Sequence, residues 1–107
     1  GNTAIEIGNL ILHPDKFEAT INETLLNLTK KEFSMLLFFV TNRNRVLTKV
    51  EIVEHLWGDY ADSFDNFDFI YTHIKNLRKK LEQAGCKIGI RTVHRLGYKL
   101  NHSETNS

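Results

Sequence analysis

The first 28 residues alternate short apolar segments with turn residues, a pattern typical of β-strands. Between these segments, Gly8-Asn9 separates the first two, and Pro14 suits the first central position of a turn in HPDK. Asn22 tolerates a left-handed backbone and suits a hairpin turn. We therefore expect a small antiparallel sheet built from four segments: 5–7 (IEI), 10–13 (LILH), 17–21 (FEATI) and 24–28 (TLLNL).

From Thr29 onward the apolar residues change to a helical period. TKKE is a capping box, in which the Thr29 hydroxyl accepts from the N–H of Glu32 and the Glu32 carboxylate reaches back. An apolar stripe at helical spacing follows and predicts a helix ending near TNRN: Phe33, Leu36, Leu37 and Val40. A second box, TKVE, opens at Thr48, and Gly58 offers a C-cap, so a second helix is expected after a tight, basic connection.

A third helix is predicted over about 66–84, after an acidic and aromatic segment that we interpret as a loop. One narrow face is apolar, formed by Phe67, Ile70, Ile74, Leu77 and Leu81. The opposite face gathers Asp68, Phe69, Thr72, Lys75, Asn76 and Lys79. Gly85 ends the helix, and two β-segments, 90–93 and 98–100, then flank the turn HRLG. Three helices followed by a basic hairpin predict a winged helix-turn-helix.

Composition narrows the class of protein. The length of 107 residues suits one domain. Cys86 is the single cysteine, so no disulfide can form within the chain, which fits a reducing cytoplasm. Neither a signal peptide nor an apolar run of roughly 20 residues appears, so we expect no membrane segment here. Because the chain begins at Gly1 and Met35 is its only methionine, we expect a piece of a longer protein.

Charge is unevenly distributed along a chain whose formal net charge is only +1. Residues 1–60 carry a net charge of −2, whereas within 69–100 eight basic residues face one acidic residue, Glu82. Such an asymmetry is typical of an anion-binding face, and nucleic acid is the commonest large anion. A solvated basic face without a partner is the plainer alternative.

Several motifs in the same order carry a resemblance to a known family. LTKKEFSMLLFFVTNRNRVLTKVEIVEHLWG, HIKNLRKKL and IRTVHRLGYKL resemble the C-terminal effector domain of OmpR/PhoB-type response regulators, over about residues 5–100. The resemblance implies an α+β fold: a four-stranded N-terminal antiparallel sheet, three helices and a C-terminal β-hairpin wing. It assigns 1–28 to the sheet, 29–84 to the helices and 88–100 to the wing of a single domain, before a polar tail at 101–107.

The resemblance also implies a function and partners. We expect sequence-specific binding of double-stranded promoter DNA for transcription regulation, on direct repeats as a homodimer and as a monomer off DNA. The segment 58–66 is expected to contact RNA polymerase. A receiver domain, absent from this fragment, and a sensor kinase are expected in the full-length cytoplasmic protein.

Residue roles follow from the same resemblance. The third helix is expected in the major groove, with Phe69, Thr72 and Asn76 at the bases; Asn can pair with adenine N6 and N7. The phosphate set comprises Trp57, His73, Lys75, Arg78, Lys79 and Thr92. For Lys79 and Lys80 simple solubility is an alternative, and Arg78 could instead pair with a scaffold acid.

The wing departs from the family pattern. The family usually has Arg-Gly before its x-Gly-Tyr, whereas this chain has His94-Arg95. Either residue could enter the minor groove. Arg95 also stands where a glycine would allow a left-handed turn, whereas Gly97 and Tyr98 are expected to be structural.

The sequence contains fewer features that support other functions. No catalytic set of residues or glycine-rich phosphate loop has coherent spacing, so no enzyme and no cofactor are expected. The five histidines, with Cys86, lack metal-ligand spacing, so no metal is expected. A winged helix that binds protein, or the effector domain of a membrane-tethered regulator, remains an alternative.

Overall fold

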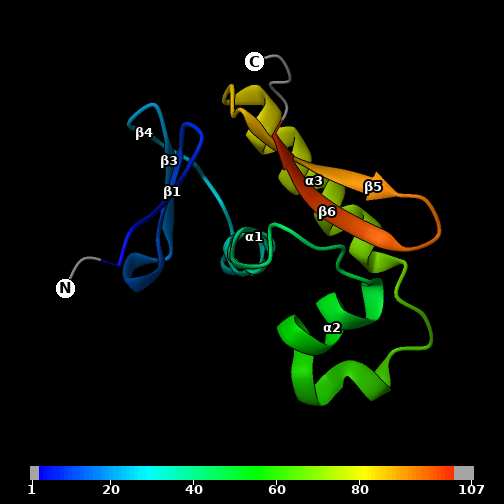
Figure 1. Cartoon of the computed structure of the whole chain (residues 1–107). Helices are drawn as coiled ribbons and strands as arrows, with labels where there is room; N and C mark the ends of the chain where they lie inside the picture. Colours follow the sequence, from blue (N-terminus) through cyan, green and yellow to red (C-terminus); the bar gives the residue numbers. More distant parts are fainter. Residues whose placement is uncertain (1–2, 103–107) are drawn as a thin grey trace.

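The computed structural model describes residues 3–102, apart from the side chains at 59 and 102. These residues form a sheet of four strands, three α-helices and a two-stranded hairpin, together with two short 3-10 helices (Figure 1). In order these are β1 (Ile5–Ile7), β2 (Leu10–His13), η1 (Pro14–Lys16), β3 (Glu18–Ile21), β4 (Thr24–Leu25), α1 (Lys30–Thr41), α2 (Lys49–Trp57), η2 (Gly58–Ser63), α3 (Phe69–Gln83), β5 (Ile88–Val93) and β6 (Gly97–His102). The expected α+β winged-helix architecture is confirmed.

The N-terminal sheet is antiparallel, with strand order β1-β2-β3-β4. Leu10 pairs with Ile21 and Leu12 with Ala19, and these four side chains are buried on one face. The predicted turn at Asn22 is confirmed, because Asn22 and Glu23 both have positive φ, at 51° and 68°. Two expectations were wrong in detail. HPDK forms one turn of 3-10 helix, and the fourth strand ends at Leu25, before the expected 28.

Both predicted capping boxes are present. The Thr29 hydroxyl accepts from the Glu32 N–H, and the Thr48 hydroxyl accepts from the Glu51 N–H, while each glutamate accepts from the N–H of its cap residue. Gly58 caps α2 with φ 41°, as expected. These local bonds satisfy N–H groups that have no partner inside the helix, and so they fix where each helix begins.

Two expectations about the third helix need correction. The helix begins at Phe69, so Phe67 precedes it and is only half-buried beside the core. The segment before it is partly ordered, since Gly58–Ser63 forms the 3-10 helix η2 where a loop was expected. The other apolar residues of α3, Ile70, Ile74, Leu77 and Leu81, are all buried as the spacing predicts.

The C-terminal hairpin is longer than its sequence pattern indicates. β5 pairs with β6 from Val93–Gly97 at the turn to Ile88–His102 at the far end, two residues beyond the expected limit at 100. The hairpin is also tied to the connection before α2, because Leu47 and Tyr98 exchange two backbone hydrogen bonds of 2.7 and 2.9 Å. A Cβ on Gly97 would lie 2.1 Å from the Leu47 carbonyl oxygen, so only glycine permits this approach.

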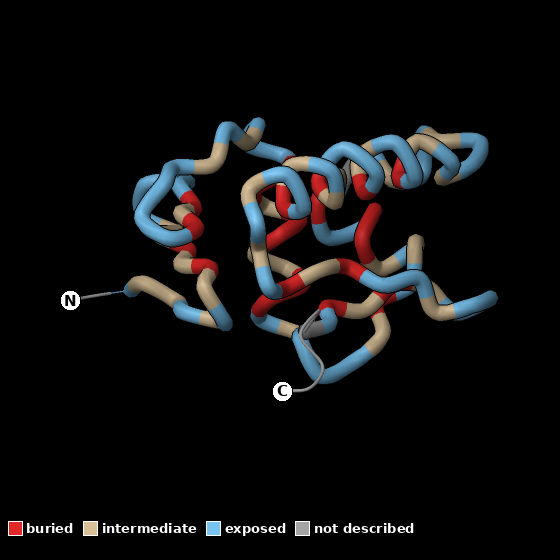
Figure 2. The backbone as a smooth tube through the Cα atoms, turned by 90° about the horizontal axis from the view of Figure 1, so that it is seen from above, coloured by how far each residue is buried: buried red, intermediate tan, exposed pale blue. Residues whose placement is uncertain are grey.

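α1 occupies the centre of the molecule. It lies between the N-terminal sheet and the unit made of α2, α3 and the hairpin (Figure 1), and it contacts α2, α3 and β6. Figure 2 shows buried segments on the surfaces where these layers meet and exposed segments on the outside. One core therefore supports both the sheet and the helical unit, and α3 has its polar face on the outside.

A polar contact joins the N-terminal sheet to the far end of α3. The Asn9 amide donates to the Gly85 carbonyl at 3.0 Å, and its oxygen accepts from the Lys87 N–H at 2.9 Å. Asn9 lies in the β1–β2 turn, whereas Gly85 and Lys87 lie between α3 and β5. One side chain thus satisfies two backbone groups some 76 to 78 positions away in sequence.

Candidate nucleic-acid interface

The outward face of α3 carries the polar side chains that the sequence analysis singled out. Thr72, Lys75, Asn76 and Lys79 are all exposed on this helix, whereas its opposite face is buried. Thr72 and Asn76 are four residues apart and therefore lie one turn from each other. The arrangement offers hydrogen-bonding side chains at the middle of the face and cations beside them, as readout of base edges and phosphates requires.

Phe69, the third residue expected at the bases, is less exposed than Thr72 and Asn76. It is half-buried, and its ring packs against Trp57 and Phe64 with centroid distances of 5.0 and 4.7 Å. His73 joins the same cluster, 5.2 Å from Trp57, and its Nδ1 lies 3.1 Å from the Phe69 carbonyl oxygen. Phe69 and His73 are four residues apart and lie at the border of the outward face of α3. Both rings pack against Trp57, and this aromatic packing explains why Phe69 is half-buried.

Trp57, expected in the phosphate set, is half-buried at the end of α2 and packs against the core. The Lys31 side chain of α1 lies 4.9 Å from its ring centroid and donates to the Leu56 carbonyl. A cation over an aromatic face is attracted by the ring quadrupole. Lys31 therefore helps to hold Trp57 and the last turn of α2 against α1, a contact that the sequence pattern does not reveal.

Arg78 has two partners on the hairpin. Its Nε donates to the Ile90 carbonyl at 2.7 Å, and a terminal nitrogen donates to the Thr92 hydroxyl at 2.7 Å. The guanidinium also lies 5.7 Å from the Tyr98 ring centroid. The expected alternative, a pair with a scaffold acid, was wrong: a carbonyl and a hydroxyl take that place among the described residues.

Lys80 belongs to the scaffold and not to the outward face. Its ammonium lies 2.6 Å from the Glu32 carboxylate, whose side chain is only 7% exposed. Burial by itself would raise the pKa of Glu32, but the hydrogen bonds from Lys80 and the Thr29 N–H, together with the charges of Lys80 and His73, lower that pKa overall. The pair locks α3 onto the first turn of α1, so solubility is not the role of Lys80.

The turn of the hairpin projects into solvent. His94, Arg95 and Leu96 are exposed, and Arg95 has φ 65°. The left-handed conformation is therefore kept although arginine replaces the usual glycine, at the steric cost that a Cβ brings. Two ionisable side chains consequently stand side by side at the tip.

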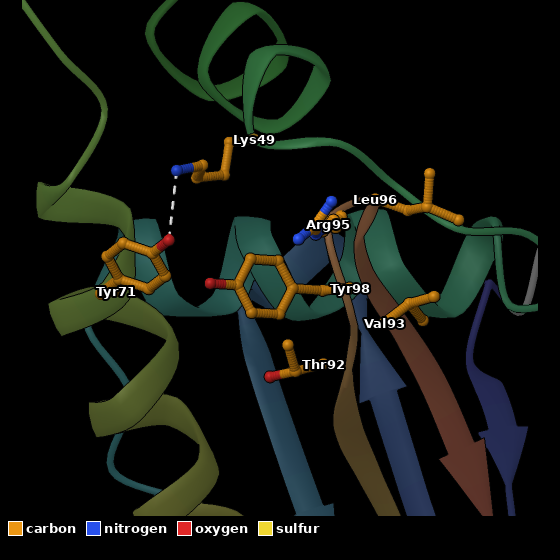
Figure 3. Close-up of a pocket in the computed structure, with 8 residues that line it drawn as sticks. Lys49, Tyr71, Thr92, Val93, Arg95, Leu96 and Tyr98 are labelled. Atoms are coloured by element: carbon orange, nitrogen blue, oxygen red, sulfur yellow. Dashed lines mark hydrogen bonds between the residues drawn. The ribbon is translucent and has the colours of Figure 1, made fainter.

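Lys49 and Tyr71 form a contact that sequence analysis missed. The Lys49 ammonium donates to the Tyr71 hydroxyl at 3.2 Å and lies 4.8 Å from the ring centroid (Figure 3). The hydrogen bond to Tyr71 raises the pKa of Lys49. The two residues are 22 positions apart, on α2 and α3, and no local pattern relates them.

Metal-binding clusters and membrane-spanning helices are two other features that the described residues could have formed. Within residues 3–102, no group of three or more His, Cys, Asp or Glu side chains is arranged to hold a metal ion. Across the same part of the chain, every helix is too short or too polar to cross a bilayer.

Comparison with known proteins identifies the class and then the family. The fold is that of DNA-binding domains: the structure superimposes on the AdeR DNA-binding domain, solved in complex with an intercistronic region, with TM-score 0.78 and 26% identity over 92% of this chain and 99% of that one. The Klebsiella pneumoniae RstA DNA-binding domain, solved with the RstA box, gives TM-score 0.77 and 26% identity, covering 91% and 95% of the two chains.

Comparison of the amino-acid sequence supports the same class of protein. Residues 22–100 match the family described as "Transcriptional regulatory protein, C terminal". The alkaline phosphatase synthesis transcriptional regulatory protein PhoP of Bacillus subtilis is 39% identical over 104 residues, 95% of this chain and 42% of PhoP. VanRB of Enterococcus faecalis is also 39% identical, over 91% of this chain and 41% of VanRB. The chain therefore belongs to the family of C-terminal DNA-binding domains of OmpR/PhoB-type response regulators. The description of this family as transcriptional regulatory confirms the expected class of protein.

Proposed function

We propose that this domain binds double-stranded promoter DNA with α3 in the major groove and the β5–β6 wing at the adjacent minor groove. The observation that carries the proposal is the outward face of α3, where exposed Thr72 and Asn76 lie beside Lys75 and Lys79. A helix fits the major groove, and its outward side chains reach base edges. The AdeR and RstA DNA-binding domains, which share this fold, were solved in complex with an intercistronic region and with the RstA box, and this supports DNA binding by the chain.

The side chains divide into base-reading and phosphate-binding sets. Asn76 reads adenine through its amide, and the Thr72 methyl contacts a thymine methyl. Phe69 supports this pair from the aromatic cluster and reaches a base only with the edge of its half-buried ring. Phosphates are held by Trp57, His73, Lys75, Lys79 and Thr92, with Arg78 adding its positive charge behind Thr92.

The proposal extends to the domains and partners that accompany this domain in the full-length protein. The chain spans about four-tenths of the length of the curated relatives it matches, for example 42% of PhoP. We infer that a receiver domain controlled by a sensor kinase accompanies it in a cytoplasmic response regulator. The domain pairs head to tail on direct repeats, is a monomer off DNA, and contacts RNA polymerase through residues 58–66.

Fluorescence anisotropy on a mixed-sequence duplex at several salt concentrations tests the proposal. The wild-type domain should bind with a steep salt dependence, and Lys75→Ala should flatten the slope of log K against log salt by about 0.9. Asn76→Ala should keep the slope. In selection from random duplexes it should lose about 1–3 kcal/mol of discrimination at one position. Absence of binding by the wild-type domain at low salt would overturn the proposal and favour a winged helix that binds protein.

A further inference from the structure

A cavity of about 210 Å³ opens between the start of α2, the first turns of α3 and the wing (Figure 3). Lys49 comes from α2 and Tyr71 from α3. The wing lines the other side with Thr92, Val93, Arg95, Leu96, Gly97 and Tyr98. Three elements that are far apart in sequence thus meet around one recess beside the outward face of α3.

The lining has the chemistry of an anion site. Of the eight described residues that line the cavity, two are cationic and none is acidic. Three more carry hydroxyl groups, on Tyr71, Thr92 and Tyr98. A phosphate group accepts hydrogen bonds at several oxygens, and ammonium, guanidinium and hydroxyl groups are its usual donors in protein–DNA contacts.

Lys49 is held in place for such a ligand. Its ammonium donates to the Tyr71 hydroxyl at 3.2 Å, and the same tyrosine ring lies 4.8 Å away. A lysine ammonium has three N–H donors, so two remain for an incoming oxygen. Because Tyr71 restrains a flexible side chain in advance, part of the entropy cost of ordering Lys49 is already met when a ligand arrives.

Thr92 has a comparable arrangement on the other wall. Its hydroxyl oxygen accepts from Arg78, so its own hydrogen is available to a ligand. Arg95, exposed at the wing turn, adds a second full charge at the rim. The positive charges therefore come from opposite sides of the recess, which favours one compact anion between them.

We propose that this cavity is a phosphate site in which Lys49, Tyr71 and Arg95 grip one phosphodiester of the DNA backbone at the junction of α2 and the wing. The inference rests on the proposed DNA-binding function and adds contacts from α2 and from Tyr71. It also divides the wing turn: Arg95 faces the backbone, and His94 is left for the minor groove. Since the contact is to a phosphate, it raises affinity for every sequence equally.

Salt-dependent anisotropy on the mixed-sequence duplex tests the site. Lys49→Gln should flatten the slope by about 0.9, because one phosphate contact is lost. Tyr71→Phe should keep the slope, since the charge remains, but weaken binding a few-fold because Lys49 loses its anchor. Lys16→Gln removes the same charge from the 3-10 helix of the N-terminal sheet and serves as the matched control, with no expected change in slope.

The outcomes separate the two proposals. A wild-type domain that binds DNA, with a slope flattened by Lys75→Ala but not by Lys49→Gln, would overturn the cavity site and leave the proposed function intact. If Lys16→Gln flattened the slope as much as Lys49→Gln, net charge would explain the effect and the site would again be overturned. Thermal melts of each variant exclude unfolding as the cause.

Thermal melts with inorganic phosphate, at an ionic strength matched with chloride, test whether the cavity binds a phosphate of DNA or a free anion. Under the proposal, Lys49→Gln changes the slope on DNA, and inorganic phosphate stabilises the wild type and Lys49→Gln equally. If inorganic phosphate raised the melting temperature of the wild type alone while the DNA slopes stayed equal, the cavity would take a free anion. That result would overturn its assignment to the DNA backbone.

Discussion

The guanidinium of Arg78 lies 2.7 Å from the hydroxyl oxygen of Thr92 and joins α3 to the wing. A second bond of 2.7 Å, to the Ile90 carbonyl, fixes the orientation of the fork. One side chain therefore links the two elements that are proposed to face DNA. In the proposed binding mode, this contact helps to set the position of the wing relative to α3.

Replacement of Arg78 should loosen that link. Arg78→Lys keeps the charge but cannot reproduce two bonds from a planar fork, so we expect the free energy of unfolding to fall by about 1–3 kcal/mol. Urea denaturation measures the change. Lys79→Ala, one residue further on the exposed face, is the control and should change stability by less than about 0.5 kcal/mol. Equal stability of Arg78→Lys and the wild type would show that the bonds contribute nothing.

Gly97 should tolerate no side chain. In Gly97→Ala the new Cβ would meet the Leu47 carbonyl at 2.1 Å, and the residue has φ 152°, so the Leu47–Tyr98 pairing must shift. We expect a loss of stability of about 1–3 kcal/mol or more. Thermal unfolding provides the measurement. Gly89→Ala is a matched control on the same hairpin, since a Cβ added there would have nothing within 4 Å; equal effects of both substitutions would contradict the steric argument.

The Glu32–Lys80 pair predicts a pH dependence of stability. The folded-state pKa of Glu32 is lowered, so its contribution is complete above the unfolded pKa, about 4.3, and is lost as pH falls through the folded value. In Glu32→Gln, the free energy of unfolding should therefore fall less steeply than in the wild type as the pH decreases below about 4.3. Chemical denaturation between neutral and acid pH measures the slope.

The control for this pH dependence is Glu82→Gln, on the exposed side of α3. It removes a carboxylate of the same type, and it should leave the acid limb of the curve close to that of the wild type. An identical acid limb for Glu32→Gln and the wild type would show that the buried carboxylate does not titrate in this range.

Asn9 should couple the N-terminal sheet to the helical unit. Asn9→Ala removes the bonds to Gly85 and Lys87, each worth about 0.5–1.5 kcal/mol, so the free energy of unfolding should fall by about 1–3 kcal/mol. Denaturation with urea checks the value. Asn27→Ala, at an exposed position between β4 and α1, is the control. A similar small loss in both variants would contradict a bridging role for Asn9.

The sequence by itself determined the features that depend on near neighbours. Thr29 and Thr48 define helix starts through residues three positions away, and the turn at Asn22 depends on the backbone of two residues. The spacing of Ile70 and Leu77 on α3 likewise decides which face is buried, and therefore that Thr72 and Asn76 face outward. Hydrogen bonds within one turn and helical periodicity are local properties, so a linear pattern contains them.

Only the tertiary structure decided how the remaining polar side chains are used. In the sequence Lys80 is one more surface cation, whereas in the fold Glu32, 48 positions away, lies beside it. Arg78 donates a hydrogen bond to Thr92 of the wing and has no acidic partner among the described residues. Phe69 packs in an aromatic cluster with Trp57, and Lys49 donates to Tyr71 beside a cavity. Long, flexible side chains reach several partners from one backbone position, and which partner is within reach depends on how the elements pack.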